Sequence, residues 1–579
     1  MEKSWKILPY NNDLVEQLRL QLHINEVLCR LLTQRGIDSF DAAKSYFRPT
    51  IDMLHNPFLM KDMDKAVGRI KQAIEKGEKI LIYGDYDVDG TTAVASMYSF
   101  LKKLHNNLEY YIPHRYREGY GVSAAGISYA IEQKVNLIIS LDCGIKSTKL
   151  VEVAAKNGID FIICDHHLPD EEIPAATAIL NAKQKDCAYP FKELCGCGVG
   201  IKLIQAISRT LGLDDSSWME YLDLAAIAIA ADIVPINGEN RVLAFYGLKK
   251  VNTKPSIGVK ALLDRSNMAG EIHINNLVFV IAPRVNAAGR MDDARKAVDL
   301  FIAESEEEAG ILADQLHADN TDRREIDASI TTQAIEMIES DEFTKHAFST
   351  LLYHPDWGAS VEEEASFGKA KGVVGIVASR LIEKYYRPTI ILTDSGGKVA
   401  GSARSVWGFN IYEAIHACND LLENYGGHFY AAGLTLLKEN VPALKTRFEE
   451  VVKSTIEPEM LTPAILIDSL IAFRDITDTF YKIVCQMEPF GPENMRPVFC
   501  AKYVYETGES RIVKEQHIKF MLMQDGITME GIGFGLAGKF ELLKPNIPLH
   551  VVFTIDQNEW NGHKKLQLKV IDINQANTA

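Results

Sequence analysis

The chain has 579 residues, and its 47% hydrophobic and 24% charged residues are the proportions of an ordinary globular protein. No apolar run reaches the roughly 18 residues that a membrane-spanning helix needs, and the first residues lack the pattern of a signal peptide. The nine cysteines follow no disulfide spacing, so a cytoplasmic protein with reduced thiols is expected. The net charge of −16 argues against nucleic-acid binding by overall charge alone.

Residues 1–50 are polar and helical in pattern, and they are predicted to form an N-terminal cap. Three short apolar runs rich in strand-forming residues follow, and they span residues 80–83, 137–141 and 161–164. Each run indicates a strand that is buried on both faces, and helical stretches such as 91–104 and 147–157 separate the runs. This alternation predicts a doubly wound parallel α/β sheet within a first domain over residues 51–305.

Four acidic or histidine-bearing motifs lie in this domain, and the first three directly follow the predicted strands. They are Gly84-Asp85-Tyr86-Asp87-Val88-Asp89-Gly90, Leu141-Asp142-Cys143-Gly144, Cys164-Asp165-His166-His167 and Ala231-Asp232-Ile233-Val234-Pro235. Ligands of a doubly wound sheet bind just beyond the carboxyl ends of its strands, so these side chains are expected to converge. Asp232 joins them from the end of a small-residue helix over residues 224–231.

The density of carboxylates predicts a metal site, because a divalent cation removes their mutual repulsion. Oxygen ligands with one or two imidazoles favour Mn²⁺ or Mg²⁺ over zinc. Two such ions about 3.5–4 Å apart activate a water and stabilise an in-line phosphoryl displacement. A calcium loop is the alternative for the first motif, but Ser96 stands where that loop carries glutamate. A metal clip at Cys187, Cys195 and Cys197 is disfavoured, because no second cysteine pair or histidine follows.

The second half of the chain indicates three further parts. Residues 306–344 carry a long charged helical pattern from Glu306 to Ile338, which predicts a connecting helix. Residues 345–456 are predicted to form a second α/β domain. Residues 457–573 suit a small β-barrel of the OB type, which commonly binds single strands, and residues 574–579 form a polar tail. The predicted barrel strands span residues 464–468, 517–522, 549–553 and 566–570.

Asp165-His166-His167 gives the sequence its resemblance to the DHH phosphoesterase superfamily, and within it to the RecJ exonuclease family. The other segments that carry the resemblance are Tyr111–Arg115 with Glu118–Gly121, Ala282–Met291, Gly375–Leu381, Gly401–Ser405, Gly426–His428, and Pro489–Asn494 with Pro497–Phe499. The resemblance covers residues 50–570. It implies a DHH domain, a DHH-associated domain and an OB-fold. It further implies a monomeric, single-stranded-DNA-specific 5′→3′ exonuclease of DNA repair and recombination, with a helicase and a single-stranded-DNA-binding protein as partners.

Position and resemblance together assign roles to individual residues. The expected metal ligands are Asp85, Asp87, Asp89, Asp142, His166 and Asp232. Asp142 is the candidate bridging ligand, and the nucleophile is expected to be a metal-bound hydroxide. Asp165 and His167 complete the catalytic set with Asp142 and His166, as residues that orient ligands or the leaving group. The family often has a histidine where Tyr83 stands, and Asp85 is expected to substitute for it.

The resemblance also implies a substrate-binding set, which consists of Arg115, Arg284, Asn286, Arg290, Ser402, Arg404, Gly426, Gly427 and His428. The arginines are expected in loops near the metals, where their planar forks suit phosphate. Ser402 and Arg404 would hold the 5′ end of the strand, and His428 would contact the scissile phosphate. The alternative for some of these arginines, for Arg290 more than for Arg404, is that they only bridge the two domains.

One departure from the family pattern follows Trp357, because residues 358–370 separate it from Lys371-Gly372-Val373-Val374-Gly375 and the expected histidine is missing. Three glutamates in this insertion would repel phosphate over the cleft, whereas a surface loop would be harmless. Two rival functions also stay open. A phosphodiesterase of short oligonucleotides or cyclic dinucleotides would not need the C-terminal barrel, and a non-catalytic DNA-binding scaffold would not need a full ligand set.

Overall fold

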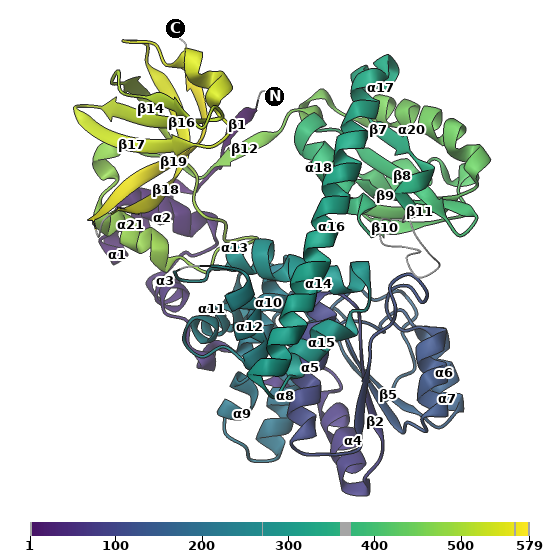
Figure 1. Cartoon of the computed structure of the whole chain (residues 1–579). Helices are drawn as coiled ribbons and strands as arrows, with labels where there is room; N and C mark the ends of the chain where they lie inside the picture. Colours follow the sequence, from purple (N-terminus) through teal and green to yellow (C-terminus); the bar gives the residue numbers. More distant parts are fainter. Residues whose placement is uncertain (1–2, 269, 359–371, 561–562, 577–579) are drawn as a thin grey trace. The chain divides into compact units, whose positions relative to one another are not determined.

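The computed structural model describes residues 3–268, 270–358, 372–560 and 563–576 (Figure 1). The chain forms two compact units, which we describe separately. Unit 1 combines the described parts of 1–54 and 464–579 with residues 235–237, and unit 2 contains the described parts of 55–234 and 238–463. Within the described residues, no helix is both long enough and apolar enough to cross a membrane.

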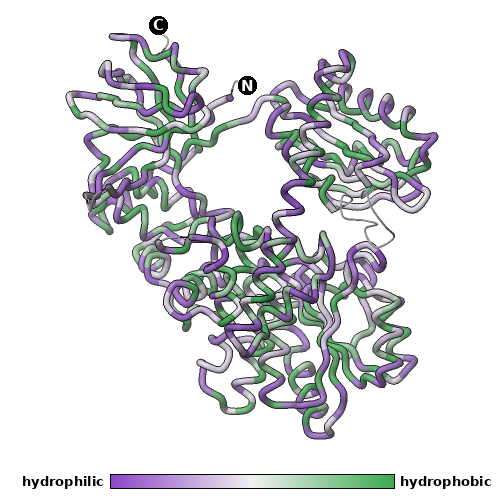
Figure 2. The backbone as a smooth tube through the Cα atoms, in the orientation of Figure 1, coloured by the Kyte–Doolittle hydropathy of each residue, from purple (hydrophilic) through white to green (hydrophobic). Residues whose placement is uncertain are grey.

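The first sheet of unit 2 has five parallel strands in the order β3-β2-β4-β5-β6. They are β2 (Ile80–Gly84), β3 (Leu108–Tyr111), β4 (Leu137–Leu141), β5 (Asp160–Cys164) and β6 (Ala178–Leu180). Strands β2 and β4 are buried over their whole length, and the central strands are hydrophobic along their course in Figure 2. The doubly wound parallel sheet is therefore confirmed. Its strand order reverses between β2 and β4, where such sheets bind their ligands.

Helices cover both faces of this sheet. Helices α6 and α7 share a core with alternate residues of β2, β4 and β5, and α5 and α8 pack on the other face. The helices of this part are α4 (Met63–Lys76), α5 (Val88–Lys102), α6 (Ala124–Glu132), α7 (Thr148–Lys156), α8 (Gly196–Thr210), α9 (Ser216–Met219), α10 (Leu222–Ala231), α11 (Gly238–Thr253), α12 (Ile257–Arg265), α13 (Ile274–Asn276), α14 (Ala282–Met291) and α15 (Arg295–Ile302).

The predicted connecting helix is confirmed as α16 (Glu306–Ser340), which has 35 residues. Ser305 caps its first turn by accepting a hydrogen bond from the Glu308 N–H, and the acidic residues of that turn complement the helix dipole. Farther along, the fully buried Asp327 lies 2.5 Å from the guanidinium of Arg380. This ion pair fastens α16 to α18 (Val374–Tyr385) of the second sheet's domain.

The second sheet of unit 2 has the order β10-β11-β9-β8-β7, with α18 on one face and α19 and α20 on the other. Among the described residues of this sheet, the β7–β8 pair alone is parallel. The remaining elements of this part are α17 (Glu342–His346), β7 (Thr350–Tyr353), β8 (Thr389–Ser395), β9 (Lys398–Arg404), α19 (Ile411–His416), β10 (Asn424–His428), β11 (Ala431–Leu436) and α20 (Val441–Thr455).

Unit 1 is a seven-stranded barrel-like sheet whose core includes residues of the N-terminal helices. Its first strand, β1, pairs in parallel with β12, so the two ends of the sequence meet in one unit. The elements are β1 (Ser4–Ile7), α1 (Asn12–Leu22), α2 (Glu26–Gln34), α3 (Phe40–Phe47), β12 (Ala464–Ile467), β13 (Ser469–Leu470), α21 (Asp478–Gln486), β14 (Phe499–Glu506), β15 (Arg511–Val513), β16 (His517–Gln524), β17 (Ile527–Gly533), β18 (Leu549–Trp560) and β19 (His563–Gln575).

Candidate active site

The first motif surrounds the turn from β2 into α5. Asp85 is fully buried, and its Oδ1 accepts a hydrogen bond from the Gly121 N–H at 3.1 Å. Asp87 caps α5 by accepting a hydrogen bond from the Gly90 N–H at 3.0 Å. Asp89 lies in the first turn of the helix. One short strand-to-helix connection thus presents three carboxylates beyond the end of β2.

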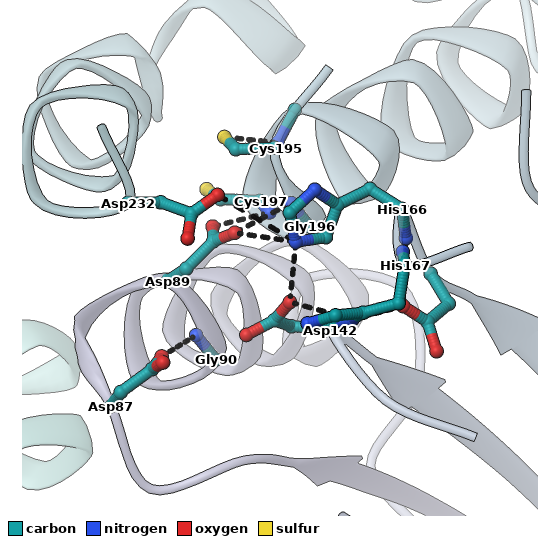
Figure 3. A network of polar contacts seen from close by, with 12 residues as sticks. Asp87, Asp89, Gly90, Asp142, His166, His167, Cys195, Gly196, Cys197 and Asp232 are labelled. Atoms are coloured by element: carbon teal, nitrogen blue, oxygen red, sulfur yellow. Dashed lines mark hydrogen bonds and ion pairs between the residues drawn. The ribbon is translucent and has the colours of Figure 1, made fainter. Parts of the chain in front are cut away.

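The N-terminus of α8 meets this motif at Asp89. The backbone N–H groups of Gly196 and Cys197 donate to the two oxygens of the Asp89 carboxylate at 2.6 and 2.7 Å (Figure 3). This approach requires a glycine, because a Cβ at residue 196 would lie 2.5 Å from the Cβ of Asp142. Helix α8 therefore orients Asp89 through its free N–H groups and positive dipole end.

His166 lies at the centre of three carboxylates. Its Nε2 is 3.2 Å from Asp142 Oδ1, 3.6 Å from Asp232 Oδ2 and 3.8 Å from Asp89 Oδ2. Asp142 follows β4 with a φ of 59°, a left-handed conformation that aspartate adopts more readily than most residues other than glycine. Asp232 comes from the C-terminal end of α10, as the sequence predicts. Figure 3 shows these side chains converging.

The pKa values of these carboxyl groups are raised because several negative charges are buried close together. Burial and neighbouring carboxylates raise the pKa of Asp85 to about 8, of Asp89 to about 7 and of Asp232 to about 9. Burial and the nearby His167 lower the pKa of His166 to about 3, so its imidazole is neutral and its lone pair is free for a metal. Asp85 Oδ2 and Asp142 Oδ1 are buried and accept no hydrogen bond. These orphaned oxygens and the oxygen-rich donor set fit Mn²⁺ or Mg²⁺.

Asp165 has a different environment, because its oxygens are already engaged. They accept hydrogen bonds from the N–H groups of Ile145, His166 and His167, and Oδ1 lies 2.7 Å from Nδ1 of His167. Burial would raise the pKa of Asp165, but these contacts outweigh it and lower that pKa to about 2. On its other side, His167 lies within hydrogen-bonding distance of the Tyr120 hydroxyl. This arrangement orients His167, as a residue that supports ligands would require.

Of the predicted phosphate-binding residues of the second domain, Ser402, Arg404, Gly426 and His428 share one face of its sheet, whereas Gly427 lies on the other. Residues directly opposite each other on neighbouring strands point to the same side. The strand register forms two such rows, which are Arg404, Ala431 and His428, and Ser402, Gly433 and Gly426. A Cβ added at Gly426 would meet nothing within 4 Å, whereas one at Gly427 would lie 2.3 Å from a backbone oxygen. Gly426 thus leaves unoccupied space above the strand backbone between the polar side chains, and Gly427 permits the tight strand pairing.

Arg290 connects the first domain to this face. Its guanidinium donates to the Gly372 carbonyl at 2.6 Å, and its own carbonyl accepts from the Tyr116 hydroxyl. Three residues past Gly372, a Cβ at Gly375 would lie 2.9 Å from Arg404. Burial and the nearby Arg115 lower the pKa of Arg290 to about 10. Arg290 therefore does bridge the two domains. Its positive charge also lies close enough to Arg115 and Arg404 for both to act on it.

The expected loop position of Arg284 and Arg290 is wrong, because both residues lie with Asn286 in helix α14. Arg284 donates to the Val280 carbonyl, and its Nε is buried without a hydrogen-bond partner. Arg115 does lie in a turn, where its guanidinium is 4.3 Å from the centre of the Tyr86 ring. Most of the insertion after Trp357 lies outside the described residues, so neither alternative for it, over the cleft or on the surface, is tested.

Sequence reasoning missed two features of the site. Tyr120 is one, since its hydroxyl reaches both His167 and the Asp142 carbonyl. The other is the start of α8, where the glycine-rich sequence from Cys195 to Gly200 was the available signal for close backbone approach. All nine cysteines are free, and the described residues contain no metal-ligating cluster that includes a cysteine.

Matches to protein-family models show which class of protein the chain belongs to. The model of the DHH family N-terminal domain matches residues 79–229, the DHHA1 domain model matches 359–454, and the RecJ OB domain model matches 467–572. The doubly wound sheet and its acidic site thus define a phosphoesterase of the DHH type.

Relatives that match nearly the whole chain show which family within this class the chain belongs to. The chain is 37% identical to the single-stranded-DNA-specific exonuclease RecJ of Bacillus subtilis, over 98% of this chain and 70% of that protein. It is 31% identical to the RecJ of Escherichia coli, over 96% and 97% of the two chains. The crystal structure of Thermus thermophilus RecJ in complex with Mn²⁺ matches with a TM-score of 0.83 and 26% identity, over 99% of this chain and 80% of that chain. The chain belongs to the RecJ family.

Proposed function

We propose that the chain digests single-stranded DNA from the 5′ end and releases 5′-mononucleotides, in DNA repair and recombination. The observation that carries this proposal is the set of three carboxylates, Asp89, Asp142 and Asp232, around His166 at the switch point of the sheet, where Asp142 Oδ1 is buried without a hydrogen-bond donor. The named activity of the RecJ relatives supports the substrate.

The residues that would hold two Mn²⁺ or Mg²⁺ ions are Asp85, Asp87, Asp89, Asp142, His166 and Asp232. Solved RecJ structures with Mn²⁺ and with Mg²⁺ support the choice of these two metals. Such ions supply Lewis acidity and an activated water for in-line displacement. Asp142 is central because it adjoins both His166 and the start of α8, which suits a carboxylate shared by two ions. Asp165 fixes the ring of His167, which would position the leaving group.

The second domain would hold the DNA backbone. Ser402 and Arg404 would bind the 5′ end, and His428, which shares a row with Arg404, would contact the scissile phosphate. The unoccupied space above Gly426 lets a phosphate approach the strand backbone. From the first domain, Arg115, Arg284, Asn286 and Arg290 would contribute positive charge and hydrogen bonds. A strand threaded between the two domains would exclude duplex without base-specific contacts.

The test is Mn²⁺-dependent digestion of long single-stranded DNA that is blocked at either its 5′ or its 3′ end. We expect mononucleotide release that only the 5′ block stops. Asp142→Asn and His166→Ala should abolish release but retain DNA binding, while the exposed Asp264→Asn serves as the matched control. Indifference to the block, or cleavage of dinucleotides alone, would move the chain to the short-substrate phosphodiesterases. Unchanged hydrolysis by both site variants would refute the metal mechanism.

Further parts of the proposal concern the setting of the enzyme. We propose the domain division 1–50, 51–305, 306–344, 345–456, 457–573 and 574–579, with the second and fourth parts as the catalytic pair. The family resemblance supports a monomer that works with a helicase and a single-stranded-DNA-binding protein. The nine free cysteines support a cytoplasmic location, where thiols stay reduced.

A further inference from the structure

Three aromatic side chains that have no role in the proposed reaction lie exposed at one end of the second sheet. Trp407, Phe429 and Tyr430 are 64%, 41% and 48% exposed. The rings of Phe429 and Tyr430 meet edge to face, with their centres 4.7 Å apart. Clustered exposed aromatic groups are costly in water and commonly mark a binding surface. We call these three residues the aromatic platform.

The backbone fixes where the aromatic platform lies. Phe429 and Tyr430 form the two-residue connection between β10 and β11, directly after His428. The Ser405 N–H donates to the Tyr430 carbonyl at 3.0 Å, so the chain leaving β9 runs beside this connection. Trp407 follows two residues later, in a turn that the Ser405 hydroxyl closes by donating to the Phe409 carbonyl.

The same end of the sheet carries the proposed phosphate contacts. Arg404 is the last residue of β9 and His428 is the last residue of β10, and both stand in the row of Ala431. The platform residues follow these two residues within three positions of the chain. Nucleotides whose phosphates are held at Arg404 and His428 therefore have their bases within reach of exposed aromatic rings.

We propose that the aromatic platform stacks on the unpaired bases that adjoin the phosphates held by Arg404 and His428. This inference rests on the proposed function. Stacking suits an exonuclease that must accept any sequence, because every base has a π-face. It also favours single strands, because the bases of a duplex are already paired and stacked on one another. The platform residues are thus positioning residues for DNA, with no part in the chemistry.

The experiment compares normal single-stranded DNA with DNA whose first nucleotides at the 5′ end are abasic. For the wild-type enzyme we expect KM on abasic DNA to be roughly tenfold higher, the scale of one lost base–aromatic stack. Trp407→Ala and Tyr430→Ala should raise KM on normal DNA by a similar factor, leave kcat unchanged, and cause no further rise on abasic DNA. Trp407→Phe and Tyr430→Phe should restore KM because they keep the aromatic ring.

The exposed Phe343→Ala, in α17 of the same part of the chain, is the matched control and should change nothing. If active Ala variants keep the wild-type KM on normal DNA, the platform does not bind bases and serves another kind of partner, while the exonuclease function stands. An equal rise of KM on normal and abasic DNA would also overturn stacking. If the wild-type enzyme digests neither normal nor abasic single-stranded DNA, the proposed function itself is refuted.

Discussion

Gly196 shows how much the metal site depends on one missing side chain. The residue begins α8, and its N–H group donates to Asp89 while its Cα faces Asp142. Both carboxylates are proposed metal ligands, and their separation is set by how closely the helix approaches. A methyl group at this position would lie 2.5 Å from the Cβ of Asp142, so one of the two segments would have to move.

We predict that Gly196→Ala abolishes most of the Mn²⁺-dependent nuclease activity and weakens Mn²⁺ binding at least tenfold, because catalytic geometry tolerates only small displacements. Circular dichroism should show a folded protein, and the Mn²⁺-induced shift in Tm should shrink. Gly310→Ala is the matched control. It lies in α16 with no atom closer than 3.6 Å to the added methyl group, and it should stabilise the helix slightly. Wild-type Mn²⁺ binding by Gly196→Ala would contradict this account.

The raised carboxylate pKa values predict a pH-dependent response to metal. Burial and neighbouring carboxylates raise the pKa of Asp85 to about 8 and of Asp232 to about 9. Each group favours the folded state when protonated, so the metal-free protein loses stability as pH rises toward these values. Since Mn²⁺ requires the deprotonated ligands, its stabilising effect should increase over the same range.

The measurement is Tm with excess Mn²⁺ and with a chelator, at about pH 6 and about pH 8. We expect a larger difference between the two Tm values at the higher pH. Asp232→Asn should flatten this dependence because it removes one of the titrating groups. A metal effect that is the same at both pH values would show that the carboxylates are already ionised in the metal-free protein.

At the scale of elements, a buried ion pair holds α8 in place. Lys202 of α8 and Glu239 of α11 are almost fully buried, with Nζ and Oε1 3.1 Å apart. Glu239 also accepts hydrogen bonds from the Tyr189 hydroxyl and the His55 N–H, and Lys202 donates to the His55 carbonyl. Because α8 carries the N–H groups that orient Asp89, this network supports the metal site from a distance.

We expect Lys202→Met to lower the free energy of unfolding by about 3–5 kcal/mol, because it leaves the Glu239 carboxylate buried without its cation. Adding Glu239→Gln should recover part of this loss, since the neutral amide needs no cation and its oxygen still accepts one of the two remaining hydrogen bonds. Lys249→Met, on the exposed side of α11, is the control and should change stability little. Urea denaturation of the three variants checks this, and equal stability of Lys202→Met and the control would refute it.

At the scale of the molecule, the two ends of the chain form one core. Residues of α1 and α2, including Leu28, belong to the same buried cluster as Phe499 and Phe553 of the C-terminal sheet. Arg35 reinforces this contact by donating to the Asn494 side chain and the Met495 carbonyl. The β1–β12 pairing adds a ladder between the first and last parts of the sequence. The barrel therefore depends on the N-terminal segment for its stability.

Leu28→Ala should destabilise unit 1 by about 2–5 kcal/mol, the cost of a cavity in a packed core. The matched control is Leu20→Ala, whose side chain is 61% exposed on α1. Hydrogen exchange measured along the whole chain should show faster exchange in β14 and β18 of the first variant only. Protection that changes in α1 and α2 alone would mean that the barrel is stable without them.

The sequence predicted the parts of the fold that local pattern determines. Short apolar runs predicted β2, β4 and β5, and a charged helical period predicted α16. It did not predict that residues 282–291 form a helix, because Pro283 and Gly289 usually oppose one. Pro283 is tolerated because it lies at the junction with the π-helical turn Leu277–Ile281, where the regular α-helical hydrogen bonds are already interrupted. The small residues of this helix, such as Gly289, allow it to pack against the first motif.

By itself, the sequence determined the identities of the candidate ligands and their positions at strand ends, because a buried parallel strand and its following turn are encoded within a few residues. Only the tertiary structure decided how these ligands meet. The approach of α8 to Asp89, the rows that join Arg404 to His428, and the core shared by both chain ends all bring together residues distant in sequence. Such contacts depend on packing and strand register across the whole chain, which no local pattern encodes.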